Sequence, residues 1–258
     1  MIEFFVFIYG IVIGSFLNVL IYRLPKEDIA FFTPKRSICP HCGYQLKWYE
    51  NIPLISYLIL KAKCANCHKP IAIHYFVVEL LSGLVSVALY LSFDITIDFF
   101  ILLLLFYTLI VLSFIDFEYK AVPDYLLLII LIIMLFVPNF NLINALIFAG
   151  GFVLLDFIIT FYIQNIKARI TKNKDLEDQV ALGEGDIPIV AMIGGILGLQ
   201  IGVVAIFLAA VFAIVPSIYA TISKKEIETP FIPYLVLGFS CGYFYTQEIV
   251  ELLNKVGL

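Results

Sequence analysis

Four cysteines in two C-x-x-C pairs are the first residues whose spacing suggests chemistry. Cys39 and Cys42 form one pair, Cys64 and Cys67 form the other, and 21 residues separate the two pairs. This spacing lets two tight turns bring four thiolates into a tetrahedron around zinc. Because a closed four-sulfur site leaves no open coordination position for a substrate, we expect the ion to be structural.

Two other interpretations of the cysteines are two disulfides or a redox pair. His41 and His68 lie within the turns and could each replace a thiolate as a ligand. The charge pattern described below places this loop in the reducing cytosol, where structural disulfides are rare, so we favour a metal. Cys241 stands alone in the last apolar segment, where we expect it to pack in the core.

Two aspartates at the ends of apolar segments form the second candidate site. Asp116 follows an apolar segment, and a carboxylate at the C-terminal end of a helix opposes the helix dipole, which argues against a stabilising cap. Asp186 ends a Gly-Glu-Gly-Asp sequence and precedes Ile187-Pro188, so it fits a helix N-cap with proline in the first turn. Glycines 183 and 185 would also let a substrate strand approach closely.

These two aspartates could act as a pair. Two carboxylates that share one proton can activate a water, one as base and the other as acid, as in aspartic proteolysis. The helix dipoles suggest that Asp116 is the protonated partner and Asp186 the ionised base. Such a pair titrates as a unit, so this division of roles is a hypothesis.

Three further carboxylates have simpler interpretations. Asp124 follows Pro123 and precedes an apolar run, as an N-cap does. Glu79 lies about one turn inside an apolar segment, where it could extend to the interface or form a hydrogen bond within the bundle. Asp156 lies deep in another apolar segment, and the sequence offers it no evident partner.

The elements that must position these residues are membrane helices. The 258 residues are 62% apolar and 14% charged, with a mean hydropathy of +1.04, which is far from the composition of soluble domains. The segment from Met1 to Ile21 contains Glu3 and no cleavage signal, so we expect a retained first span. Glycines interrupt the apolar run from 187 to 222, so its first part could be re-entrant. In all, eight apolar stretches are expected to cross the bilayer, at residues 2 to 22, 74 to 93, 97 to 115, 122 to 138, 142 to 163, 187 to 199, 201 to 222 and 232 to 250.

The loop charges predict the orientation of these spans. The loops at 23 to 73, 116 to 121, 164 to 186 and 223 to 231 fall on one side and hold 15 of the 16 Lys and Arg residues. The positive-inside rule makes that side the cytosol, so both chain ends face outward and both candidate sites lie at the cytosolic face. The net charge of −4 says little about partners, and no nucleic-acid-binding pattern is present. The oligomeric state cannot be inferred.

We therefore expect an all-α polytopic bundle with a small zinc-stapled cytosolic insertion. Its parts would be a first span at 1 to 22, a cytosolic loop at 23 to 73 and a membrane bundle at 74 to 258.

With these motifs in order, the chain resembles the type IV prepilin peptidases, or leader peptidase/N-methyltransferases. The resemblance covers nearly the whole chain. Its motifs are Gly14-Ser-Phe-Leu-Asn-Val19, Arg23-Leu-Pro25, the two C-x-x-C turns, Trp48-Tyr-Glu-Asn-Ile-Pro-Leu-Ile-Ser-Tyr57, Ile115-Asp116, Pro123-Asp124, Gly183-Glu-Gly-Asp186 and Thr229-Pro-Phe-Ile-Pro-Tyr234.

The resemblance implies an inner-membrane endopeptidase that removes the leader of prepilins and pseudopilins after a glycine, at the cytosolic face. Asp116 and Asp186 correspond to the catalytic pair, and residues 74 to 258 to the peptidase bundle. Longer members with a loop like 23 to 73 also methylate the new N-terminus using S-adenosylmethionine. The sequence contains no Rossmann-type nucleotide loop, so methylation and the donor rest on the resemblance alone, with Asn18 and Glu50 as candidate polar participants.

Three alternatives remain open at this point. The chain could be a peptidase that has lost methylation, or a proton-coupled transporter, since intramembrane carboxylates also serve proton relays. It could also be a non-enzymatic assembly protein whose metal organises a docking loop. Transporters place carboxylates near mid-bilayer within repeated halves, and neither feature is visible in this sequence.

Overall fold

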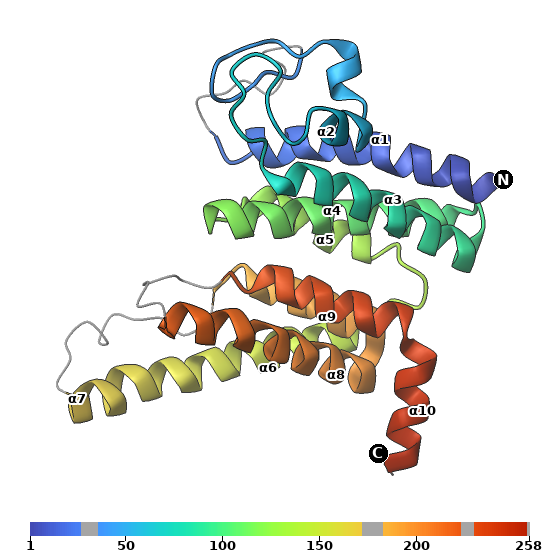
Figure 1. Cartoon of the computed structure of the whole chain (residues 1–258). Coiled ribbons are helices and arrows are strands. Elements are labelled where there is room, and N and C mark those ends of the chain that lie inside the picture. Colours follow the sequence, from blue (N-terminus) through green and yellow to red (C-terminus); the bar gives the residue numbers. More distant parts are fainter. Residues whose placement is uncertain (27–35, 172–182, 223–229, 257–258) are drawn as a thin grey trace. The chain divides into compact units, whose positions relative to one another are not determined.

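The computed structural model describes residues 1–26, 36–171, 183–222 and 230–256, which divide into two compact units (Figure 1). The first unit is Met1–Pro123 and the second is Asp124–Leu258. The first unit contains α1 (Ile2–Arg23), the short helices η1 (Trp48–Asn51) and α2 (Ile55–Ile59), and the long helices α3 (Ile73–Phe93) and α4 (Ile97–Tyr119). The second contains α5 (Asp124–Met134), α6 (Leu142–Phe161), η2 (Tyr162–Lys167), α7 (Ala168–Thr171), α8 (Asp186–Ile222), α9 (Ile232–Phe244) and α10 (Thr246–Val256).

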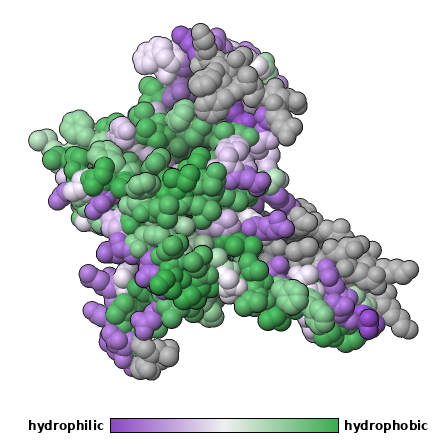
Figure 2. Space-filling model, turned by 180° about the vertical axis from the view of Figure 1, so that it is seen from behind, coloured by the Kyte–Doolittle hydropathy of each residue, from purple (hydrophilic) through white to green (hydrophobic). Residues whose placement is uncertain are grey.

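The expected all-α membrane architecture is confirmed. The described residues form helices and two isolated β-bridges, with no strand among them. Within the described ranges, five helical segments are long and apolar enough to cross a bilayer, and α5 and α9 are shorter apolar helices. Large apolar side chains such as Phe4, Leu104 and Phe207 lie exposed on the outer faces of these helices. Figure 2 shows broad hydrophobic areas over the helices, as expected of surfaces that contact lipid.

In the first unit, α1 packs closely against α3 because small residues line the contact. Gly10 and Gly14 of α1 are one turn apart, and a Cβ atom at Gly14 would lie only 2.8 Å from the Cα of Glu79 in α3. Such small-residue contacts let membrane helices approach backbone to backbone. The hydroxyls of Ser86 and Tyr107 lie 2.7 Å apart and join α3 to α4 by a hydrogen bond. The three long helices therefore form one packed group on which the cysteine loop sits.

In the second unit, α8 is the central helix and contacts α5, α6 and α9. Phe148 of α6 fills the space that Gly194 and Gly202 leave on α8. Gly198 has φ 75° and ψ −178°, which is not helical, so α8 consists of two helical parts joined at a kink. The glycine-marked break expected near residue 200 is therefore present, and the kink position allows only glycine without strain.

Several expected span boundaries differ in the structure. The fifth span was expected to end at 163, but the helical segment that begins with α6 continues through η2 and α7 to Thr171. The third span was expected to end at 115, but α4 continues to Tyr119 because Lys120 adopts a left-handed cap with φ 53°. The fourth was expected to reach 138, but α5 ends at Met134, shortly before Pro138, which disfavours helical geometry in the residue before it.

The last span was expected to run from 232 to 250, but the apolar helix α9 ends at Phe244. The Thr246 hydroxyl donates to the carbonyl of Gly242, and a separate helix, α10, follows with Glu248 in its first turn. Parts of the expected polar loops, at 27–35, 172–182 and 223–229, lie outside the described residues.

Candidate active site and metal centre

The two C-x-x-C segments fold as matching turns. In the first turn, the N–H of Gly43 donates to the carbonyl of Cys39 at 2.9 Å, and in the second the N–H of His68 donates to Cys64 at 3.0 Å. Gly43 and His68 occupy the same place, four residues after the first cysteine of each pair, and both have positive φ angles. A tight turn of this kind requires the left-handed conformation, which glycine adopts freely and histidine at some cost. Each turn is closed by a β-bridge, Ile38 with Gln45 and Lys63 with Pro70.

The turns bring the four cysteine sulfurs together. The Sγ atoms of Cys39, Cys42, Cys64 and Cys67 all lie within 4.8 Å of one another, and none is in a disulfide. The Cys39–Cys67 and Cys42–Cys64 sulfur distances are 3.9 and 4.0 Å. A tetrahedral ion with metal–sulfur bonds of about 2.3 Å needs sulfurs about 3.8 Å apart. The four thiols thus form a cluster that can hold a metal ion, and all four sequence-predicted ligands belong to it.

Backbone N–H groups favour thiolates in this cluster. A hydrogen bond from the backbone of Tyr44 lowers the pKa of Cys42 to about 7 despite some desolvation. Backbone hydrogen bonds from Cys67 and Asn66 likewise lower the pKa of Cys64. At Cys67 a backbone hydrogen bond from Lys69 acts in the same direction, but desolvation and the neighbouring cysteine thiols outweigh it and raise the pKa to about 11. Because metals bind the thiolate form, the backbone donors favour metal binding at Cys42 and Cys64. The imidazoles of His41 and His68 are not part of the cluster.

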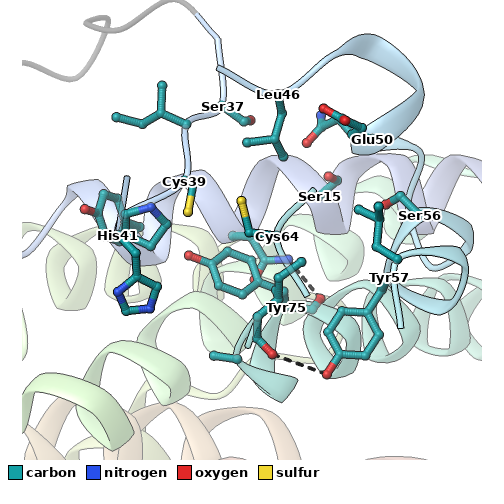
Figure 3. A pocket seen from close by; sticks show the side chains of 18 of the residues that line it. Ser15, Ser37, Cys39, His41, Leu46, Glu50, Ser56, Tyr57, Cys64 and Tyr75 are labelled. Atoms are coloured by element: carbon teal, nitrogen blue, oxygen red, sulfur yellow. Dashed lines mark hydrogen bonds between the residues drawn. The ribbon is translucent and has the colours of Figure 1, made fainter. Parts of the chain in front are cut away.

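A cavity of about 430 Å³ lies between the cysteine turns and the C-terminal half of α1 (Figure 3). Its walls include Asn18 from α1, Glu50 from η1 and Glu79 from α3, all of them buried. Cys39 and Cys64 form part of the wall, so the cluster borders one side of the cavity. The last turn of α4 reaches it through Glu118.

Hydrogen bonds hold the loop over the helices. The carboxylate of Glu79 accepts from the backbone N–H of Leu54 at 2.8 Å, which fixes Leu54 in an unusual conformation with φ 60°. The carboxylate of Glu50 accepts from the N–H of Lys47 at 2.7 Å and from the Tyr44 hydroxyl at 3.4 Å. Of the two roles expected for Glu79, the hydrogen-bonded one is therefore confirmed.

The candidate catalytic aspartates are both buried at helix ends. Asp116 lies in the last turn of α4 and is 8% exposed. Asp186 is the first residue of α8 and is 6% exposed, with its carboxylate beside Gly183. Pro188 lies in the first turn of α8, as expected. Asp116 and Asp186 lie in different units, so the pairing of their carboxylates stays a prediction.

Three other residues that the sequence singled out, Asp156, Asp124 and Cys241, lie within helices of the second unit. Asp156 accepts a hydrogen bond from Thr160, one turn further along α6, at 3.3 Å. The sequence interpretation missed this partner, although the spacing of four residues is a signal for it. Asp124 begins α5, in agreement with the expected helix start. Cys241 is half-buried in α9.

These features define a multi-pass membrane protein with a four-cysteine insertion between its first two long helices. The family comparison is more specific. Residues 8–93 match the bacterial peptidase A24 N-terminal domain, and residues 103–218 match the type IV leader peptidase family.

Curated relatives match over most of their length. Each of three is named prepilin leader peptidase/N-methyltransferase. The protein from Vibrio cholerae is 33% identical, with 92% of this chain and 94% of that protein covered. Those from Legionella pneumophila and Pseudomonas aeruginosa are each 32% identical, covering 95% and 94% of this chain and 91% and 90% of theirs. The chain therefore belongs to the type IV leader peptidase family. No solved structure gives a significant match.

Proposed function

We propose that this protein removes the leader peptide of prepilins with the carboxyl groups of Asp116 and Asp186 and then methylates the new N-terminus. The observation that carries the peptidase proposal is the burial of both aspartates at helix ends, inside the region that matches the leader peptidase family. Buried carboxylates in an apolar bundle are costly and are expected where they have a function. The curated relatives' name supplies both activities.

In the proposed reaction, the ionised carboxylate takes a proton from water while the water oxygen bonds to the scissile carbonyl carbon. The protonated carboxyl donates its proton to the carbonyl oxygen. When the tetrahedral adduct collapses, the C–N bond breaks and the departing nitrogen takes the proton that the base received from water. A hydroxyl of the adduct returns its proton to the other carboxylate, which restores the pair. The helix dipoles assign the base to Asp186 and the acid to Asp116. The scissile bond follows a glycine near the cytosolic interface, where the apolar prepilin helix would be held by the bilayer.

In the proposed methylation, S-adenosylmethionine supplies an electrophilic methyl group. When bound, it would transfer this methyl group to the unprotonated N-terminal amine, with the electron pair of the C–S bond left on sulfur and one amine proton released to solvent. Asn18 and Glu50 are the residues of this chain that would hold the donor.

The metal in this proposal is zinc, bound by Cys39, Cys42, Cys64 and Cys67. The sulfur spacing fits a tetrahedral ion, and four protein ligands leave no position for catalysis. Zinc would therefore hold the two turns together and keep the wall of the cavity in place. The loop charges support an inner-membrane protein with both ends outside and the aspartates at the cytosolic face.

The test is a mass-spectrometric assay with a model prepilin in membranes, with and without S-adenosylmethionine. Wild type should release the leader and, with the donor, add one methyl mass to the product. Asp116→Asn and Asp186→Asn should each abolish cleavage, whereas Asp156→Asn, a matched change elsewhere in the bundle, should not. Cleavage by both site variants would refute the pair. Cleavage without methylation would leave a peptidase only, and absence of cleavage in wild type would favour the non-enzymatic alternatives.

A further inference from the structure

The cavity beneath the cysteine turns has the features of a ligand site. Its volume of about 430 Å³ lies in the range of small-molecule pockets, about 300 to 1,000 Å³. All of its lining belongs to the first unit, from α1, the loop, α3 and the end of α4. Figure 3 shows Ser15, Glu50 and Tyr57 on one side of the view, Cys39 and His41 on the other, and Tyr75 near the centre. The peptidase proposal does not use this cavity.

The polar groups of the cavity suit a cation. Three carboxylates line it, those of Glu50, Glu79 and Glu118, and the last lies 3.9 Å from the imidazole of His74. The cationic side chains Arg23 and Lys69 also line the cavity. A positively charged ligand gains from nearby carboxylates when both are shielded from water. A ligand that carries its own carboxylate could also use one of the two cations.

Aromatic rings add a second reason for a cation. Tyr22, Tyr44, Tyr57 and Tyr75 all line the cavity. The face of an aromatic ring attracts cations, including those with no hydrogen to donate. A sulfonium is such a cation, and rings of this kind also stack against a planar base. The Tyr22 ring already has the Lys26 ammonium 3.5 Å from its centroid, which shows that a cation can lie over a ring of this lining. The lining therefore suits a cation that also carries a planar base, such as a sulfonium nucleoside.

Asn18 supplies an independent indication of a ligand. It is 4% exposed and lines the cavity from α1. Its amide nitrogen donates to the carbonyl of Tyr75 at 3.0 Å, but its Oδ1 atom is buried and has no hydrogen-bond partner among the described residues. A buried acceptor without a donor costs free energy. A ligand with an N–H or O–H group would remove that cost.

Hydrogen bonds from neighbouring residues fix the position of the Glu50 carboxylate in the cavity wall. Two hydrogen bonds, from the N–H of Lys47 and the hydroxyl of Tyr44, fix its carboxylate, and the residue is 8% exposed. A carboxylate has about four acceptor positions, so about two of them remain for hydrogen bonds from a ligand. Carboxylates commonly accept hydrogen bonds from ribose hydroxyls in nucleotide sites.

The cavity also lies close to one end of the proposed peptidase site. Glu118 reaches its wall from the last turn of α4, and Asp116 lies two residues earlier on the same turn. The two side chains point to different faces of α4, so cleavage at Asp116 would release the new amine one helix diameter, roughly 10 Å, from this cavity. A methyl donor bound there would be placed for the second reaction.

We infer that this cavity binds S-adenosylmethionine, with Asn18 and Glu50 as ligand-binding residues and the tyrosine rings around the sulfonium. The inference rests on the methylation part of the proposed function and assigns that reaction a location in Met1–Pro123. Because Cys39 and Cys64 form part of the wall, the cysteine cluster then shapes the donor site as well as the loop.

The first experiment is equilibrium dialysis of the purified full-length protein in detergent with tritiated S-adenosylmethionine. Glu50→Gln keeps the size and the acceptor for Lys47 but removes the charge, so we expect binding at least ten-fold weaker. Asn18→Leu should weaken binding to a similar extent. Asp98→Asn removes a carboxylate of the same unit that does not line the cavity, and it should bind as wild type does. Gel filtration and melting temperature establish that each variant is folded.

The second experiment maps the site without relying on variants. Ultraviolet crosslinking of the same ligand to wild type, followed by peptide mass spectrometry, should label peptides within residues 15–23 or 37–79, which line the cavity. Label confined to residues 124–258, or unchanged binding by folded Glu50→Gln and Asn18→Leu, would overturn the inference, although wild type could still methylate. Binding in the cavity without methylation of a cleaved prepilin would support the site and refute the proposed second activity. The absence of both binding and methylation would refute the binding site and the proposed methylation.

Discussion

The close approach of α1 and α3 can be tested with a single methyl group. In Gly14→Ala, the new Cβ atom would lie 2.8 Å from the Cα of Glu79 and 3.0 Å from both the Cβ and the Oγ of Ser82. Ordinary contacts begin near 3.4 Å. Since the Cα of Glu79 belongs to the helix backbone, no side-chain rotation relieves the contact. The two helices must separate locally by about 0.6 Å or more.

The expected cost follows from overpacking in a filled core, about 1–3 kcal/mol. That free energy corresponds to a change of about 5- to 160-fold in the folding equilibrium. Gly150→Ala is the matched control, because a Cβ at Gly150 of α6 meets no atom within 4 Å. Alanine is the better helix former, so the control should be neutral or stabilising by up to about 1 kcal/mol.

The measurement is equilibrium unfolding of the purified proteins in mixed micelles of dodecyl maltoside and SDS, followed by far-ultraviolet circular dichroism. Gly14→Ala should unfold at a lower SDS fraction than wild type, whereas Gly150→Ala should not. Equal midpoints for Gly14→Ala and Gly150→Ala would refute backbone contact between α1 and α3, and with it the cavity wall that these helices form.

Two other changes test the metal cluster and the kink in α8. Cys64→Ser should lower bound zinc, measured by plasma mass spectrometry, from about one ion per chain and should make the loop more sensitive to protease. Cys241→Ser, a change outside the cluster, is the control and should retain the ion. If Cys64→Ser retained its zinc, that result would argue against the four-thiolate site. Gly198→Ala places a side chain at φ 75°, so it should destabilise the protein by about 1–3 kcal/mol in the same micelles. Gly151→Ala, which has open space around it, is its control, and equal midpoints would contradict the kink.

The parts of the structure that were predictable from sequence depend on short-range rules. The spacing of the cysteines fixes two turns, so the cluster could be inferred before any coordinates. The glycine-rich stretch around Gly198 indicated a break, and a kink is present there. Helix ends were less predictable: α4 passes its expected end because Lys120 adopts a left-handed cap, which no propensity rule assigns to lysine.

The cavity could not be derived from sequence because its walls come from distant segments. Asn18 and Glu50 attracted attention as polar residues near the loop, but only the fold places them on one cavity with Glu118. The hydrogen bond between Glu79 and Leu54 is likewise a long-range contact that no local pattern encodes. The pairing of Asp116 with Asp186 rests on sequence reasoning, and the mutational assay decides it.

The bond from Leu54 to Glu79 has a consequence for how the protein is made. During synthesis, Leu54 leaves the ribosome 25 residues before the carboxylate that holds it. The cysteine turns can thus close around an ion before α3 exists, but the segment between them, which contains Leu54, cannot reach its final conformation until α3 has entered the membrane. Insertion of the second long helix is therefore the step that completes the loop. A fragment ending before residue 73 should bind metal and still lack a finished cavity.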